Sequence, residues 1–179
     1  LQSLNYILPI ITFPYLTRVL GPDNFGLIAF SSAFIGYFQI FTDYGFNLSA
    51  TRQISMNRND NEKLSNIFSE VFSAKLLLML ISFVVLLIII FTFSKFSNNK
   101  FLYLFTFGLV IGSCLFPTWL FQGIEKMRYI TILNVLTGVI FTLSIFIFVK
   151  ESTNYIYVPL INAISSILIG LISLYIIKN

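Results

Sequence analysis

The sequence predicts an all-α integral membrane protein, a bundle of six transmembrane helices. Of the 179 residues, 57% are hydrophobic and only 10% are charged, whereas a soluble domain contains about 25% charged residues. Six apolar stretches, each close to the length of about 20 residues that crosses a bilayer, alternate with polar ones. We therefore treat residues 1–179 as a single transmembrane domain. Because the chain starts at Leu1 inside an apolar run, we expect it to be a fragment of a longer chain.

The first apolar segment, 1–16, contains Pro9 and Pro14, which predict a kinked or broken helix. Gly21 and Pro22 follow, a combination that ends one helix and precedes the next. The second segment, 25–48, carries a carboxylate, Asp43, well inside the run. A charged group at this depth costs about 2.5–3.5 kcal/mol on insertion scales, so it is rarely left facing lipid.

Polar and small residues of the second segment recur at spacings of three and four, which places them on one helix face. They are Ser32, Gly36, Gln39, Asp43 and Asn47. Such a stripe faces other protein or a water-filled cavity. Asp43 then has two interpretations. It is a structural carboxylate bonded to Asn, Ser or Arg side chains between packed helices, or it lines a central cavity, where it contacts substrate or couples to an ion.

The third apolar segment, 71–93, follows a long polar stretch whose second half is patterned. Apolar residues recur there at helical spacing, at Leu64, Ile67, Phe68, Val71 and Phe72. This pattern predicts that residues 61–75 form an amphipathic helix along the membrane interface. We expect Lys75, near the start of the third segment, to extend to the lipid headgroups; an ion pair inside the bundle is the alternative.

The remaining segments are 101–121, 129–149 and 155–177. The fourth contains Gly108 and Gly112, a small-xxx-small pattern that allows two helices to approach closely. Polar or small stripes follow on the fifth segment and on the sixth, and these are more typical of packing than of ligand binding. Their members are Thr131, Asn134, Gly138 and Thr142, and then Asn162, Ser165, Ser166, Gly170 and Ser173.

The basic residues indicate an orientation, because cytoplasmic loops carry an excess of Lys and Arg. The loops after segments two, four and six hold Arg52, Arg58, Lys63, Lys126, Arg128 and Lys178. The opposite loops hold Arg18, Lys95, Lys100 and Lys150. We expect both ends of this segment to lie in the cytoplasm. Arg18 and Arg52 flank helices, where they anchor to headgroups or help to form an electropositive cavity for an anionic substrate such as a diphosphate.

The sequence argues against enzymatic chemistry. It contains no His and a single cysteine, Cys114, and it lacks paired carboxylates within one segment, metal-ligand spacings and Gly-rich phosphate loops. We therefore expect a protein that is not an enzyme and has no cofactor. The net charge of +4 is spread over loops, which fits membrane flanks better than nucleic-acid binding.

Three motifs resemble a known family. Residues 14–26 (PYLTRVLGPDNFG) resemble the N-terminal signature of the polysaccharide biosynthesis family. Residues 43–52 (DYGFNLSATR) and 116–123 (FPTWLFQG) are similar to the same family. That family includes the O-antigen flippases of the multidrug/oligosaccharidyl-lipid/polysaccharide exporter superfamily.

The resemblance implies a fold and a function. Family members move undecaprenyl-diphosphate-linked oligosaccharides across the bacterial inner membrane, and two helical lobes enclose their central cavity. This chain would then be the N-terminal lobe of a two-lobed, MATE-like transporter that works by alternating access. Its partners would be the lipid-linked oligosaccharide, membrane lipid and the second lobe of the same chain. The polysaccharide polymerase and glycosyltransferases are further candidates. Transport would be coupled to H⁺ or Na⁺.

The predicted substrate cavity combines motif residues with members of the polar stripes. It comprises Arg18, Gln39, Asp43, Asn47, Arg52, Asn134 and Asn162. Two other functions stay open: a cation-coupled exporter of small amphipathic compounds, and a non-transporting membrane scaffold subunit of polysaccharide assembly.

Overall fold

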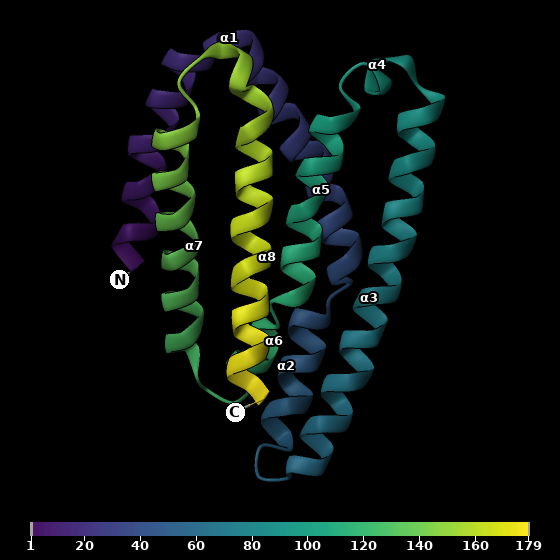
Figure 1. The fold of residues 1–179 in the computed structure, drawn as a ribbon. Helices are drawn as coiled ribbons and strands as arrows, with labels where there is room; N and C mark the ends of the chain where they lie inside the picture. Colours follow the sequence, from purple (N-terminus) through teal and green to yellow (C-terminus); the bar gives the residue numbers. More distant parts are fainter. Residues whose placement is uncertain (1, 179) are drawn as a thin grey trace.

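The computed structural model describes residues 2–178, with side chains from residue 7 onward. The described residues form helices and no strand (Figure 1). The elements are α1 (Gln2–Asp43), α2 (Phe46–Met56), α3 (Asn61–Thr92), α4 (Ser94–Ser97), α5 (Lys100–Leu115), α6 (Thr118–Gly123), α7 (Met127–Phe148), the 3₁₀ helix η1 (Ser152–Ile156) and α8 (Tyr157–Lys178). The long helices run up and down the bundle, which confirms the predicted all-α membrane fold.

The element α1 is two helices joined at Gly21. This glycine has φ 76° and ψ 166°, a conformation that only glycine adopts without strain, and Pro22 is well suited to the first turn of a new helix. In Figure 1 the chain rises from the N-terminal end, turns over at the top and descends. The helix is continuous through Pro9 and Pro14, so a break at these prolines, one of the two predicted forms, was wrong; a kink there stays a prediction. Five apolar stretches are long enough to cross a membrane, and the turn inside the first makes six spans.

Two spans are interrupted partway along their length. The second was predicted to be continuous through residue 48, but α1 ends at Asp43, and Tyr44 (φ 39°) and Gly45 (φ 81°) separate it from α2. The fourth is interrupted at Phe116 and Pro117, between α5 and α6. The two short helices that follow these breaks, α2 and α6, pack against each other at the lower end of the bundle (Figure 1).

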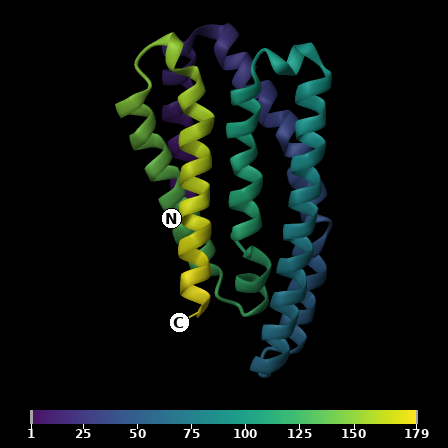
Figure 2. The same cartoon turned by 45° about the vertical axis from the view of Figure 1, so that its right-hand side comes forward.

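The predicted small-xxx-small pattern joins α5 to α8, which lie side by side in Figures 1 and 2. A Cβ atom added to Gly108 would collide with Ala163, and one added to Gly112 would lie 2.5 Å from the Cβ atom of Ser166. Since such distances do not occur between real atoms, the two backbones approach as closely as they do only because these positions are glycine. The polar stripe of the sixth span is therefore largely a packing surface.

Buried hydroxyl groups connect the other helices in pairs. The side-chain oxygens of Thr12 and Thr142 lie 3.2 Å apart, those of Ser31 and Thr106 3.3 Å apart, and those of Thr42 and Ser82 3.4 Å apart. Every buried side-chain N or O atom in the described part of the chain has a hydrogen-bond partner. The outer faces are apolar instead. For example, α3 exposes Leu77, Leu80, Val84, Ile88 and Phe91, as expected of a helix that lipid surrounds.

Residues 61–75 are the first turns of the continuous helix α3. The Asp60 carboxylate caps this helix by accepting a hydrogen bond from the backbone N–H of Lys63 at 3.1 Å, which lowers the pKa of that carboxyl. The apolar residues Leu64, Ile67 and Phe68 pack onto the cluster around Trp119. The amphipathic face thus turns toward the bundle, and its placement at the bilayer interface stays a prediction.

We expect Gly112→Ala to destabilise the full-length protein by about 1–3 kcal/mol, because the added methyl group overpacks the α5–α8 contact. The matched control is Gly26→Ala, where an added Cβ atom meets nothing within 4 Å. The unfolding temperatures of both variants are measured by thermal unfolding in detergent. Equal unfolding temperatures for the two variants would contradict the close approach of α5 and α8.

Candidate functional site

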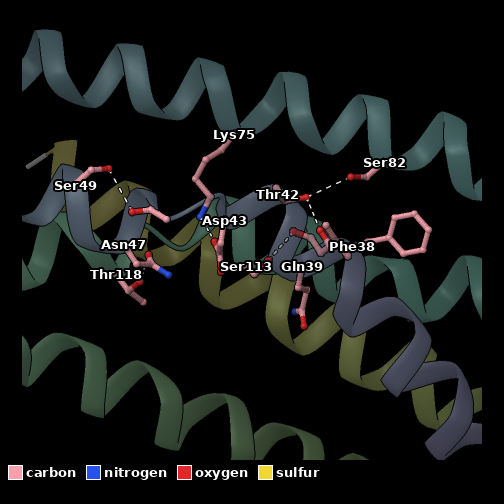
Figure 3. A network of polar contacts seen from close by, with 12 residues as sticks. Phe38, Gln39, Thr42, Asp43, Asn47, Ser49, Lys75, Ser82, Ser113 and Thr118 are labelled. Atoms are coloured by element: carbon pink, nitrogen blue, oxygen red, sulfur yellow. Dashed lines mark hydrogen bonds and ion pairs between the residues drawn. The ribbon is translucent and has the colours of Figure 1, made fainter.

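The candidate site lies at the end of α1, where Asp43 meets a lysine from α3. The Lys75 ammonium nitrogen lies 2.7 Å from Oδ1 of Asp43 (Figure 3). The Lys75 side chain is 2% exposed and the Asp43 side chain is 35% exposed. The expectation that Lys75 extends to the headgroups was therefore wrong, and the alternative of an ion pair inside the bundle is confirmed. The partner of Asp43 is a lysine, where Asn, Ser or Arg was expected.

The sequence contained a signal for this pair. Lys75 follows Val71 by four positions and Phe72 by three, so it continues the helix face that begins at Leu64. In the structure this inward face of α3 goes on through Ser82, Leu86 and Ile90, all buried. A lysine on a buried face needs a partner, because an unpaired ammonium group is strongly destabilising in a region without water.

The position of Asp43 makes its charge unfavourable without Lys75. Asp43 is the last residue of α1, and the partial negative charge at a helix C-terminus disfavours a carboxylate and favours a cation. The Lys75 ammonium offsets this effect and neutralises the carboxylate. Lys75 lies about 20 Å along α3 from Asn61, the first residue of that helix, at 1.5 Å per residue. The pair is thus a charged site inside the bundle, reached from one side.

An open groove gives access to that site. Its volume is about 600 Å³, and its lining residues are Ala33, Gly36, Tyr37, Gln39, Ile40, Asp43 and Ser113. Three members of the predicted polar stripe, Gly36, Gln39 and Asp43, are among them. The Gln39 amide donates to the backbone carbonyl of Leu109 in α5 at 3.4 Å, which holds its side chain across from α1 toward α5. The groove therefore offers amide, hydroxyl and carboxylate groups to a polar ligand.

The structure does not bring the other predicted residues into this groove. Asn47 lies in the first turn of α2, after the break, and its side-chain oxygen accepts a hydrogen bond from Thr118 at 3.4 Å, which connects α2 to α6. Arg18 lies one turn before Gly21 and Arg52 lies in α2; both are exposed. Their part in a substrate cavity stays a prediction.

The two asparagines from the later stripes lie elsewhere. Asn134 is exposed and lines a separate pocket of about 270 Å³ between the first part of α1 and α7. Asn162 is half-buried in α8. Around Asn134 the stripe of α7 packs onto α1, where Gly138 faces Leu8 and Thr142 bonds to Thr12. The structure thus places Gln39 and Asp43 together and the remaining candidates apart.

No group of three or more His, Cys, Asp or Glu side chains that could hold a metal ion occurs in the described part of the chain. The chemistry that this region offers is ion pairing and hydrogen bonding. The Asp43–Lys75 pair presents a carboxylate to the groove and keeps an ammonium group behind it.

Comparison with known proteins matches this chain to one family and to two curated relatives. The family model described as "Polysaccharide biosynthesis protein" matches residues 1–179. Proteins named "Putative O-antigen transporter" are 33% identical over 178 residues in Escherichia coli (strain K12) and 34% identical over 180 residues in Shigella dysenteriae. These alignments cover 99% and 98% of this chain but 43% and 44% of the relatives, so the chain spans less than half the length of the curated relatives it matches. No solved structure matches.

The unequal burial of the two partners predicts unequal effects of removing them. We expect Asp43→Leu to destabilise the full-length protein by about 3 kcal/mol, because it leaves the buried Lys75 ammonium unpaired. Lys75→Met should cost less, because the carboxylate that remains reaches the groove. The double variant should recover part of the loss, since an apolar pair of similar volume replaces the ion pair.

Thermal unfolding of the single and double variants in detergent measures this cycle. The matched control is Lys63→Met, which removes an exposed ion pair to Asp60 and should leave the unfolding temperature nearly unchanged. A loss for Lys63→Met as large as that for Asp43→Leu would contradict the role assigned to the buried pair.

Proposed function

The chain belongs to the polysaccharide biosynthesis protein family, and from this we propose that it is the N-terminal lobe of a polysaccharide transporter. The complete protein would flip undecaprenyl-diphosphate-linked O-antigen or capsular repeat units across the bacterial inner membrane. The names of the relatives support transport in place of catalysis, and their greater length leaves room for a second lobe. Polysaccharide polymerase and glycosyltransferases would act on the same lipid-linked units.

The observation that carries this proposal is the Asp43–Lys75 pair beside an open groove within a span. A lipid-linked oligosaccharide needs a polar path for its sugars and diphosphate, while its lipid tail can stay in the bilayer. The groove supplies such a path along α1, and a second lobe facing it would close it off from lipid. A charged pair at this depth is costly, and in membrane proteins such residues mark substrate and ion pathways.

Coupling to H⁺ or Na⁺ would act through competition at Asp43. A proton or sodium ion on this carboxylate would remove the partner of the Lys75 ammonium, which would then be available to a phosphate oxygen. The pair lies next to the break at Tyr44 and Gly45, where the chain leaves α1 for α2. A change at Asp43 would therefore be transmitted to the α2–α6 unit below it, which suits alternating access.

We expect the end of the bundle that carries the α2–α3 loop to face the cytoplasm, as the loop Lys and Arg residues indicate. In full-length protein whose other exposed cysteines are replaced, Asn59→Cys should resist a membrane-impermeant maleimide applied to intact cells. Asn98→Cys, between α4 and α5 at the other end, should react. Cys114 is buried and should not interfere. The reverse labelling pattern would overturn this orientation.

A strain that lacks its own flippase tests the transport proposal. The full-length gene should restore surface polysaccharide, and Asp43→Asn should lower it at least about tenfold, corresponding to about 1.4 kcal/mol in a transport barrier. Asp60→Asn is the matched control, because Asn also caps a helix well and Asp60 is not among the residues that line the groove. Surface polysaccharide is read from gels, and protein abundance from immunoblots.

Each alternative function has its own outcome in this strain. Unchanged polysaccharide for Asp43→Asn at normal abundance would contradict a coupling role. Resistance to amphipathic drugs without restored polysaccharide would indicate an exporter of small compounds. If lipid-linked repeat units still reach the periplasmic leaflet normally when the protein is absent, the protein would be a scaffold subunit.

A further inference from the structure

A second groove lies at the lower end of the bundle, away from Asp43. It forms where the start of α3, the end of α6 and the end of α8 meet (Figure 1). Its volume is about 510 Å³. We call it the basal groove, and its lining residues are Arg58, Asn61, Leu64, Ser65, Phe68, Leu120, Ile124, Lys126 and Ile177. None of them lines the groove beside Asp43.

The floor of the basal groove is apolar. Leu64 and Phe68 come from α3, Leu120 and Ile124 from α6 and the turn after it, and Ile177 from the last turn of α8. These are the residues of the amphipathic 61–75 segment and its packing partners. Leu120 belongs to the buried cluster around Trp119, and the other four are partly buried residues that pack against it. The fold therefore fixes the floor, and the partly exposed surface of these side chains is one on which hydrocarbon can pack.

The rim of the basal groove is polar and cationic. Arg58 forms an exposed ion pair with Glu125 at 2.7 Å. Lys126 has no ion-pair partner among the described residues, and the side chains of Asn61 and Ser65 make no hydrogen bond there. The lining includes two cations and no carboxylate. A ligand here would meet one free ammonium group and two unused polar side chains beside an apolar surface.

We propose that the basal groove binds an anionic phospholipid of the bilayer, with its phosphate at Lys126, Asn61 and Ser65 and the start of an acyl chain on Leu64 and Phe68. The groove lies at an end of a membrane-spanning bundle, where headgroups are found, and basic pockets between membrane helices bind anionic headgroups. A free phosphate ion would leave the apolar floor exposed, and a zwitterionic lipid would leave the cationic rim unneutralised. This inference needs only the membrane bundle and does not rest on transport.

Trp119 provides a probe of the groove. It is the single tryptophan of this chain, and its ring centroid lies 5.8 Å from that of Phe68, which lines the groove. Brominated acyl chains quench tryptophan at short range. Full-length protein with its other tryptophans replaced by Phe is reconstituted in phosphatidylcholine vesicles that contain increasing fractions of dibrominated phosphatidylglycerol or dibrominated phosphatidylcholine.

We expect dibrominated phosphatidylglycerol to quench Trp119 at a lower mole fraction than dibrominated phosphatidylcholine. Lys126→Gln should weaken this preference about fivefold, the effect of one basic residue near an anionic surface. Arg128→Gln is the matched control, because Arg128 is exposed two positions away and does not line the groove. Ser65→Phe, at an exposed position, should fill the groove and reduce quenching by both lipids.

Three outcomes would overturn the proposal. Identical quenching curves for the two brominated lipids would show that the groove does not select an anionic headgroup. Equal effects of Arg128→Gln and Lys126→Gln would show general attraction to the basic end of the bundle. Absence of quenching by either lipid would show that protein, such as the remainder of the chain, covers the groove.

Discussion

A lysine with almost no exposed surface sets the arrangement of this bundle. The Lys75 ammonium must have an anionic partner, and the carboxylate within reach is that of Asp43, 2.7 Å away. This requirement fixes the end of α1 against α3. The next contact between the two helices, Thr42 with Ser82, lies one position before Asp43 and two turns after Lys75, so the ion pair and the hydroxyl pair together define how α1 and α3 pack.

The ion pair also lies at the point where the backbone leaves its regular path. Broken helices inside a membrane are tolerated where neighbouring groups satisfy the freed backbone atoms. Here Thr51 donates to the carbonyl of Trp119 at 3.2 Å, and Gly123 packs closely on Ile54. The motifs 43–52 and 116–123, separate in the sequence, thus form one structural unit at the lower end of the bundle. Residues of these two family-like motifs therefore hold α2 and α6 together.

Membership of the polysaccharide biosynthesis protein family agrees with this architecture. The groove beside Asp43, the pocket around Asn134 and the basal groove lie in different parts of the bundle. The charged pair distinguishes the first of them as the candidate path for a polar substrate, while the cationic rim and apolar floor of the basal groove match the bilayer surface.

The sequence by itself determined the features that depend on neighbours along the chain. Composition and segment length give the six spans, helical periodicity places Gly36, Gln39 and Asp43 on one face, and the spacing of Gly108 and Gly112 indicates a close helix contact. The turn at Gly21 and Pro22 was also predicted from the sequence and is confirmed. Only the tertiary structure decided that Lys75 pairs with Asp43, that Asn134 lies in another pocket, and that the helix continues through Pro9 and Pro14. These outcomes depend on which helices meet. Periodicity defines a face, but the partner of that face is fixed by packing between residues that are distant in the sequence.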